Sequence, residues 1–350
     1  MVPPERSRDI QYINRLRILA VYAVVTAHVA IWLAMDAEAF TFDWWVGGWL
    51  FYLGHASIPI FVMISGALLL DDARQESAGR FYRRRLFRVG IPLVVWTVVY
   101  LVVRVFVDGE QLSLGRAVSL ILSADPYYHL WFLYMVFGLY LITPALRTFV
   151  RHSTQGERLG VIVIGLVLAN AYFQADVLLW DNQRSIFTMF LPYIPYYLCG
   201  YELRRVDPKT IPSRYLILAV VVSALYLAAF FDAFMERQGG IGVRYLFDFF
   251  SPPVVFLSIG IFWAAQQHDV AGEPLLGWRK TALEWVASTT LGIYVLHPLV
   301  LEGLRRALSD QAGEGNFVAA ILVVPFVTFV ACDLITSLLM NIPGLRRCVH

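Results

Sequence analysis

The chain has 350 residues, of which 59% are hydrophobic and only 15% are charged, and its mean hydropathy is +0.63. Soluble domains carry about 25% charged residues, so this composition excludes an ordinary soluble protein and predicts a polytopic membrane protein. The net charge of +2 gives no indication of a nucleic-acid partner, and none is expected.

Apolar segments follow one another along the whole chain and predict ten transmembrane helices. No long stretch remains for a soluble domain, so we expect one all-α transmembrane bundle, a single domain spanning residues 1–350. The ten predicted spans cover residues 16–35, 48–70, 90–107, 129–149, 159–174, 186–203, 214–231, 249–266, 284–302 and 317–340.

Lysine and arginine are distributed unevenly between the loops. If the N-terminus lies inside, 21 of these residues fall in inner segments and 7 in outer segments. Cytoplasmic loops of membrane proteins carry the excess of positive charge. The distribution therefore predicts that both termini are cytoplasmic in an inner (plasma) membrane protein.

The first predicted span carries two ionisable residues, Arg17 and His28, separated by ten residues. On an α-helix, eleven steps return a residue to within about 20° of the same face and raise it by about 16 Å. Arg17 near the inner edge and His28 near the middle therefore face the same space. A buried structural histidine and a snorkelling arginine are the alternatives, but ionisable groups at this depth usually serve a function.

Three more histidines fall in the outer half of the membrane or at its outer rim: His55, His129 and His297, on spans two, four and nine. A neutral imidazole is tolerated in a low-dielectric site and is the form that a general base needs. The aromatic residues around His129, Trp131 among them, are explained equally by an interfacial belt and by stacking against a sugar. The histidines lie on separate spans with no ligand spacing, so no metal site is expected.

The inner side offers positive charge. Arg83, Arg84, Arg85 and Arg88 precede the third span, and Arg84 and Arg88 are expected to share a helix face. They fit either an anchor to anionic lipid or a clamp for phosphate groups. Ser65, beside Gly66 in the second span, fits either close helix packing or the approach of a ligand. Asp333 in the last span is expected to form a structural ion pair.

Several sequence blocks resemble the acyltransferase-3 family of membrane acyltransferases, in the right order over most of the chain. RLRILAVYAVVTAH resembles the family's first-span motif, IPIFVMISGALLL its second-span block, and FYRRRLFRVGIPLVVW the arginine-rich start of span three. YYHLWFLYMVFGLYLITPALR and LGIYVLHPLV are similar to further blocks of surface-polysaccharide O-acetyltransferases of the enterobacterial-common-antigen type.

The resemblance implies transfer of an acyl group, most often acetyl, from cytoplasmic acyl-CoA to a hydroxyl of an envelope glycan or lipid-linked sugar. Acetyl-CoA would be a co-substrate, with no permanently bound cofactor. His28 and Arg17 would be catalytic, and Arg83, Arg84, Arg85, Arg88 and Ser65 would bind the donor. The expected acceptor-binding residues are His55, His129, Trp131, Tyr294 and His297.

The rival interpretation is a transporter or flippase of a glycan or acyl carrier without chemistry of its own, because polar residues near mid-membrane fit that class too. Such proteins have inverted repeats, and the sequence has no clear internal symmetry. A membrane sensing module, a third possibility, would need a soluble partner domain.

Overall fold

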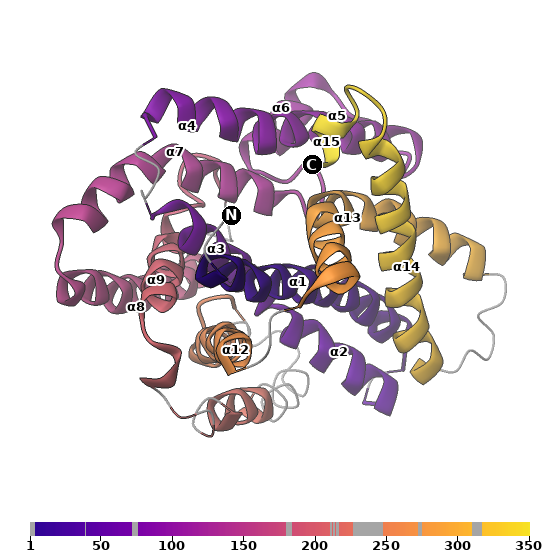
Figure 1. Ribbon diagram of the computed structural model, residues 1–350. Helices are drawn as coiled ribbons and strands as arrows, with labels where there is room; N and C mark the ends of the chain where they lie inside the picture. The colour runs from indigo at the N-terminus through magenta and orange to yellow at the C-terminus, as the bar shows by residue number, and fades with distance from the viewer. Residues whose placement is uncertain are drawn as a thin grey trace. The chain divides into compact units, whose positions relative to one another are not determined.

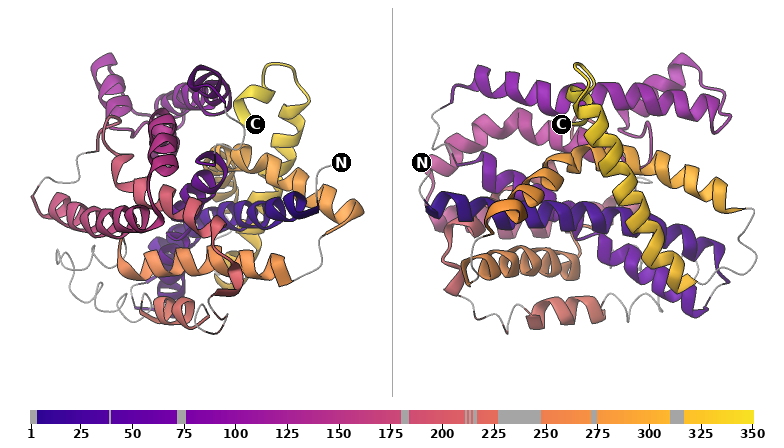
Figure 2. Two further views of the ribbon diagram at one scale, coloured as in Figure 1. Left: turned by 60° about the vertical axis from the view of Figure 1, so that its left-hand side comes forward. Right: turned by 45° about the vertical axis from the view of Figure 1, so that its right-hand side comes forward.

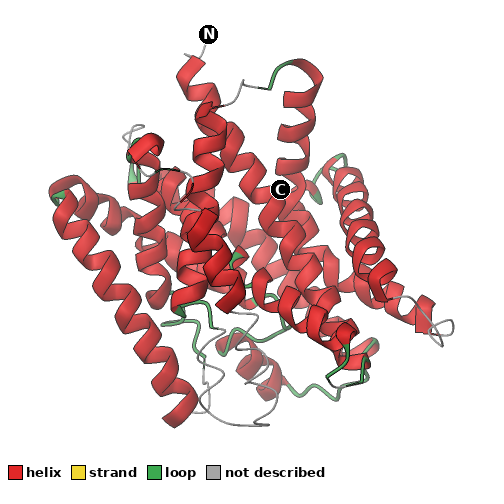
Figure 3. Ribbon diagram, turned by 90° about the horizontal axis from the view of Figure 1, so that it is seen from below, coloured by secondary structure: helices red, strands yellow, loops and turns green. Residues whose placement is uncertain are grey.

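The computed structural model describes residues 4–38, 40–71, 76–179, 184–210, 212, 214, 217–226, 248–271, 275–309 and 317–350. Every regular element within these ranges is helical (Figure 3). The all-α prediction is therefore confirmed.

The helices of the first half are α1 (Pro4–Asp36), α2 (Phe42–Gly54), α3 (Ser57–Leu69), α4 (Ala78–Arg85), the π-helical turn η1 (Leu86–Gly90), α5 (Ile91–Phe106), α6 (Leu114–Leu122) and α7 (Trp131–His152). Those of the second half are α8 (Gln155–Leu179), the 3₁₀ turn η2 (Leu191–Tyr193), α9 (Ile194–Arg205), the 3₁₀ turn η3 (Pro208–Thr210), α12 (Pro252–Ala271), α13 (Gly277–Ser309), α14 (Phe317–Met340) and α15 (Arg346–Val349).

Six stretches of helix among the described residues are long and apolar enough to cross a membrane. They cover Gln11–Asp36, Phe42–Leu69, Ala78–Phe106, Trp131–His152, Gln155–Ala175 and Phe317–Met340. The chain is thus a multi-pass membrane protein. The predicted eighth and ninth spans fall in α12 and α13, and residues 215–216 and 227–231 of the seventh lie outside the described residues. The count of ten spans stays a prediction.

The helices, which are labelled in Figure 1, group into two compact units. The first unit consists of Met1–Ile64 and Arg204–Leu338, and the second of Ser65–Leu203 and Leu339–His350. Each unit is described by itself below.

In the first unit, α2 packs closely against α1 because small residues meet at the contact. A Cβ on Gly47 would lie 2.7 Å from the Ala34 Cβ, and one on Gly54 would lie 2.5 Å from the Ala27 Cβ. Since the higher-numbered glycine meets the lower-numbered alanine, the two helices run antiparallel. Towards the C-terminal end of α1, the helices α1, α13 and α14 share a buried apolar cluster of Val29, Ala30, Leu301, Phe317, Ile321 and Val324. The ribbons of these three helices are indigo, orange and yellow in Figure 2.

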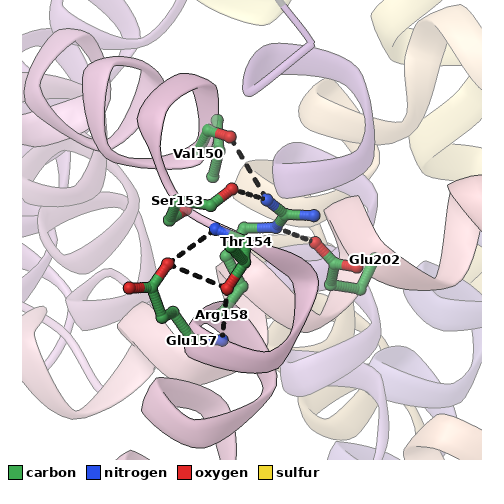
Figure 4. Close-up of polar contacts among 6 residues, drawn as sticks. All are labelled: Val150, Ser153, Thr154, Glu157, Arg158 and Glu202. Carbon is green, nitrogen blue, oxygen red and sulfur yellow. Dashed lines mark hydrogen bonds and ion pairs between the residues drawn. The ribbon is translucent and has the colours of Figure 1, made fainter.

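In the second unit, Gly66 lies against the backbone of α9, where a Cβ would meet the Tyr197 carbonyl oxygen at 1.8 Å. Close packing therefore accounts for this glycine. The turn between α7 and α8 is held by Arg158, which donates to the Glu202 carboxylate on α9 and to the Ser153 carbonyl (2.5 Å) (Figure 4). Thr154 and Glu157 bond each other reciprocally at the start of α8, as in a capping box.

Two local departures from regular helix were not predicted. The second span, expected as one segment, consists of α2 and α3, which meet at His55 and Ala56. The start of the third span contains the π-helical turn η1, between Arg84 and the following helix. The α-helical repeat that would place Arg84 and Arg88 on one face is interrupted there. Single π-turns of this kind occur frequently at functional sites.

Candidate functional site

Arg17 and His28 lie on the same uninterrupted helix, α1, as the sequence predicts. Both side chains are partly buried. Because the helix is continuous between them, the spacing of about 16 Å along one face applies to the folded chain.

His28 stacks on His297 of α13. The centroids of the two imidazole rings are 5.2 Å apart, and the ring planes are inclined by 20°. His297 is fully buried. Two histidines separated by 268 intervening residues, and expected on spans one and nine, thus form one site within the first unit. Tyr294, one turn earlier on α13, lies with its ring centroid 5.9 Å from that of His297.

The residue after His297 determines how its ring is held. Pro298 has no N–H and so cannot form the helical bond to the Tyr294 carbonyl four residues earlier. His297 Nδ1 lies 2.6 Å from that same carbonyl oxygen. Since a carbonyl only accepts, Nδ1 carries the hydrogen, and in the neutral ring Nε2 holds the lone pair.

His55 repeats this arrangement at the junction of α2 and α3. Its backbone N–H bonds the Tyr52 carbonyl (3.0 Å), and its Nδ1 lies 3.1 Å from the Phe51 carbonyl. The His55 ring also stacks on Phe249, with centroids 4.9 Å apart. The contact of Gly54 with Ala27 places the start of this junction beside the turn of α1 that carries His28. The first unit therefore gathers His28, His55, Tyr294 and His297 of the predicted site.

The second unit contains Arg83, Arg84, Arg85 and Arg88, and the surroundings of Arg85 differ from those of the other three. Arg83, Arg84 and Arg88 are exposed, and Arg84 forms an ion pair with Glu76 (3.2 Å). Arg85 is partly buried, with its guanidinium carbon 5.4 Å from the ring centres of both Phe81 and Tyr140. Its Nε atom is buried and has no hydrogen-bond partner among the described residues.

Two neighbours extend the surroundings of Arg85. The Ser65 hydroxyl lies 3.4 Å from the Tyr140 hydroxyl, which connects the predicted serine to this cluster. Arg147, near the end of α7, lies over the Phe81 ring, with its guanidinium carbon 4.6 Å from the ring centre. Arg147 also donates to the Leu69 carbonyl (2.7 Å). Sequence reasoning missed Arg147, because 61 residues separate it from Arg85 and only the packing of α7 on α4 joins them.

His129 and Trp131 also belong to the second unit. His129 is buried, and its ring meets Tyr100 edge-on with centroids 4.8 Å apart. Trp131 carries the guanidinium of Arg184 over its ring at 5.3 Å and lies 6.2 Å from Tyr193. Hence the predicted acceptor residues are divided between the units, three in the first and two in the second.

Asp333 does not form the expected structural ion pair within the described part of the chain. Among the described residues its hydrogen-bond partner is the Thr289 hydroxyl (2.6 Å) rather than an arginine. That hydroxyl also lies 2.8 Å from the Val286 carbonyl, and one hydrogen cannot serve both oxygens fully. The Thr289 hydroxyl thus shares its hydrogen between Asp333 and the Val286 carbonyl, and it links α13 to α14.

The arrangement thus offers a stacked pair of imidazoles in one unit and a partly buried guanidinium in the other. These groups can move a proton and hold an anion. No group of three or more histidine, cysteine or carboxylate side chains within the described ranges is placed to hold a metal ion.

Comparison with known proteins identifies the family of this chain. The acyltransferase-3 family model, described as an acyltransferase domain, matches residues 10–336. Neither the curated proteins nor the solved structures give a significant match. The family match covers the apolar helices and every predicted site residue, and it favours an enzyme over a transporter. On this basis, the chain belongs to the acyltransferase-3 family and is a membrane acyltransferase.

Proposed function

We propose that this protein is an O-acyltransferase that moves an acyl group, most simply acetyl, from cytoplasmic acyl-CoA to a hydroxyl of an envelope glycan or lipid-linked sugar. The whole chain acts as one catalytic domain in the inner (plasma) membrane. The observation that carries the proposal is the stacked pair of His28 and His297 in a chain of this family.

The proposed topology has ten spans with both termini in the cytoplasm. Spans one and nine then run in the same direction, from inside to outside. The contacts of α1 with α13 support this, because His28 meets His297 and, eight residues further along both helices, Asp36 meets Arg305. Because the residue number increases by the same amount on both helices from one contact to the next, the two helices run parallel.

The donor site is proposed at Arg85, with Arg83, Arg84 and Arg88 at its rim and Ser65 beside it. A guanidinium binds phosphate through paired hydrogen bonds. Arg85 suits this role best, because its guanidinium is partly desolvated by Phe81 and Tyr140 and has no carboxylate partner among the described residues. A partly desolvated cation without a partner gains more from an incoming anion than one already paired.

In the proposed reaction, a ring nitrogen of His28 takes the proton of the acceptor hydroxyl while the oxygen attacks the thioester carbonyl carbon. The C–S bond then breaks, and the CoA thiolate receives the proton from the imidazolium. Arg17, on the same face of α1, sits between the cytoplasmic edge and His28. In the second possible route, His28 takes the acyl group first and passes it to the hydroxyl.

The test uses purified protein with acetyl-CoA labelled in the acetyl group. Release of free CoA, with or without an added acceptor, is expected for an acyltransferase. Label that stays on the protein after denaturation, and is lost in His28→Ala, supports the acyl-histidine route. An intact thioester after prolonged incubation with envelope glycan contradicts the proposed donor.

A further inference from the structure

The contact between α1 and α13 continues beyond the histidine pair. On α1, Trp32 and Asp36 follow His28 at intervals of four residues, and on α13, Leu301 and Arg305 follow His297 at the same intervals. Residues four apart lie on one helix face, about one turn above each other. Because the helices are parallel, the side chains above His28 and His297 face a common line that leads from the histidines to the ends of both helices.

Two contacts of Arg305 define the end of this line. The Arg305 guanidinium carbon lies 5.8 Å from the Trp32 ring centre, and its Nη2 lies 3.8 Å from the Asp36 carboxylate. The side chains of Arg305 and Asp36 are 53% and 57% exposed, so the pair sits at an open rim. Trp32, in contrast, packs against the buried apolar cluster of the first unit, which fixes its ring.

Two features of this rim are unfavourable in a purely structural role. The indole N–H of Trp32 is buried and has no acceptor among the described residues. Buried indole N–H groups usually find a partner, because leaving the donor unsatisfied destabilises the fold. Asp36 is the last residue of α1. The negative end of the helix dipole lies there, and it is unfavourable for a negatively charged carboxylate. Both groups would be satisfied by a ligand that offers acceptor oxygens and hydroxyl donors.

We propose that Trp32, Asp36 and Arg305 form the acceptor subsite and bind a carbohydrate one to two helical turns beyond His28. Asp36 would accept hydrogen bonds from the hydroxyls of the sugar, and Arg305 and the indole N–H of Trp32 would donate to its oxygens. In the proposed topology this rim is at the outer side of the membrane. The assignment rests on the proposed function, since only that function requires a hydroxyl to reach His28.

An interfacial membrane anchor is the competing explanation for a tryptophan beside an arginine. The geometry favours the sugar site for two reasons. An anchoring tryptophan directs its N–H toward water and headgroups, whereas the Trp32 N–H is buried. Asp36 beside Arg305 also cancels the positive charge that would attract anionic headgroups.

The experiment measures sugar binding directly, without acyl transfer. The full chain in nanodiscs is titrated with the methyl glycosides of glucose, galactose and N-acetylglucosamine, and binding is followed by saturation-transfer NMR. The variants are Arg305→Gln and Trp32→Phe, which keeps an aromatic ring but removes the N–H. Arg306→Gln is the matched control, because Arg306 is adjacent and exposed but pairs with Glu302 (2.7 Å). Thermal unfolding midpoints verify that each variant is folded.

At least one glycoside is expected to bind the parent protein, and Arg305→Gln is expected to raise its dissociation constant about tenfold or more. Trp32→Phe should weaken binding in the same direction, and Arg306→Gln should match the parent. Failure of every glycoside to bind the parent, or equal binding by all four proteins, overturns the subsite. Unchanged sugar binding with poorer membrane insertion of Arg305→Gln identifies the rim as an anchor. Sugar binding without cleavage of acetyl-CoA would refute the proposed acyl transfer but not the sugar subsite. Cleavage of acetyl-CoA without sugar binding would refute the subsite alone.

Discussion

His28 and His297 place their imidazole rings 5.2 Å apart in a nearly parallel stack, although they come from opposite ends of the chain. Two positive charges at this distance repel each other, so the pair holds one proton more readily than two. A proton taken by His28 therefore meets a neutral neighbour. The Tyr294 carbonyl holds the Nδ1–H of His297, which fixes the ring against which His28 stacks.

Replacing His28 by alanine should abolish acyl transfer while leaving expression and membrane insertion intact. General acid–base assistance contributes about 10²–10⁴-fold to a rate, so loss of the base should be easy to measure. The measurement is the release of CoA from labelled acetyl-CoA by the purified variant. Retention of more than a tenth of the parent rate would show that His28 is not the base.

Pro298→Ala tests the positioning of His297 without touching either ring. The new amide N–H can form the helical bond to the Tyr294 carbonyl and so compete with His297 Nδ1. The expected result is a severalfold fall in kcat with little change in KM for acetyl-CoA. Proline within a helix costs about 3 kcal/mol, so the thermal unfolding midpoint should stay the same or rise. A fall in kcat that accompanies a lower midpoint would instead indicate general damage to α13.

The sequence predicts some features of this molecule well and misses others for physical reasons. Helix content follows from long apolar runs, and the shared face of Arg17 and His28 follows from helical spacing alone. The partnership of His28 with His297 depends on which helices pack together, which local spacing does not encode. The dipeptide His297–Pro298 did indicate a partner for the His297 ring, because a proline leaves the carbonyl four residues earlier without its helical hydrogen bond.

The arginine cluster shows the same limit. Composition identifies a positively charged segment from Arg83 to Arg88, but it does not show which of these arginines is best suited to bind an anion. The π-helical turn and the rings of Phe81 and Tyr140 set Arg85 apart, and neither is apparent from periodicity. Arg147 joins the cluster only through tertiary packing.

Arg85→Ala should weaken CoA binding more than Arg84→Ala. A charge-assisted hydrogen bond contributes roughly 1.5–3 kcal/mol, so loss of the Arg85 contact should raise the dissociation constant about 10- to 150-fold. Arg84 is exposed and paired with Glu76, and its loss should cost less. Arg85→Lys should recover only part of the affinity, because lysine lacks the paired donors.

Calorimetric titration with CoA, and with CoA lacking its 3′-phosphate, gives these affinities. A lipid anchor predicts altered insertion but unchanged CoA affinity in the inserted protein. Equal affinities for the parent and for Arg85→Ala would therefore move the donor site elsewhere.

Both termini should be cytoplasmic. The reason is the excess of lysine and arginine in the predicted inner segments, 21 against 7. A reporter that works only in the cytoplasm should be active when fused after His350, and an export-dependent reporter at the same position should be inactive. The opposite pattern would rule out an even number of spans with the N-terminus inside.

Arg158 and Glu202 should stabilise the second unit rather than take part in the reaction. The two side chains are 11% and 5% exposed, and Arg158 also bonds two backbone carbonyls at the end of α7 and the turn after it (Figure 4). Removing one partner of a buried ion pair costs about 3–5 kcal/mol, because the other charge is left uncompensated. Glu202→Ala should therefore lower the thermal unfolding midpoint of the purified protein clearly.

Glu157→Ala is the matched control for this prediction. Glu157 is exposed and caps the first turn of α8 through Thr154, so its loss should cost only about 1 kcal/mol. Both variants should keep the parent affinity for CoA at temperatures where they remain folded, since neither residue lies in the Arg85 cluster. A Glu202→Ala protein with an unchanged midpoint but impaired turnover would show that this pair serves catalysis instead of stability.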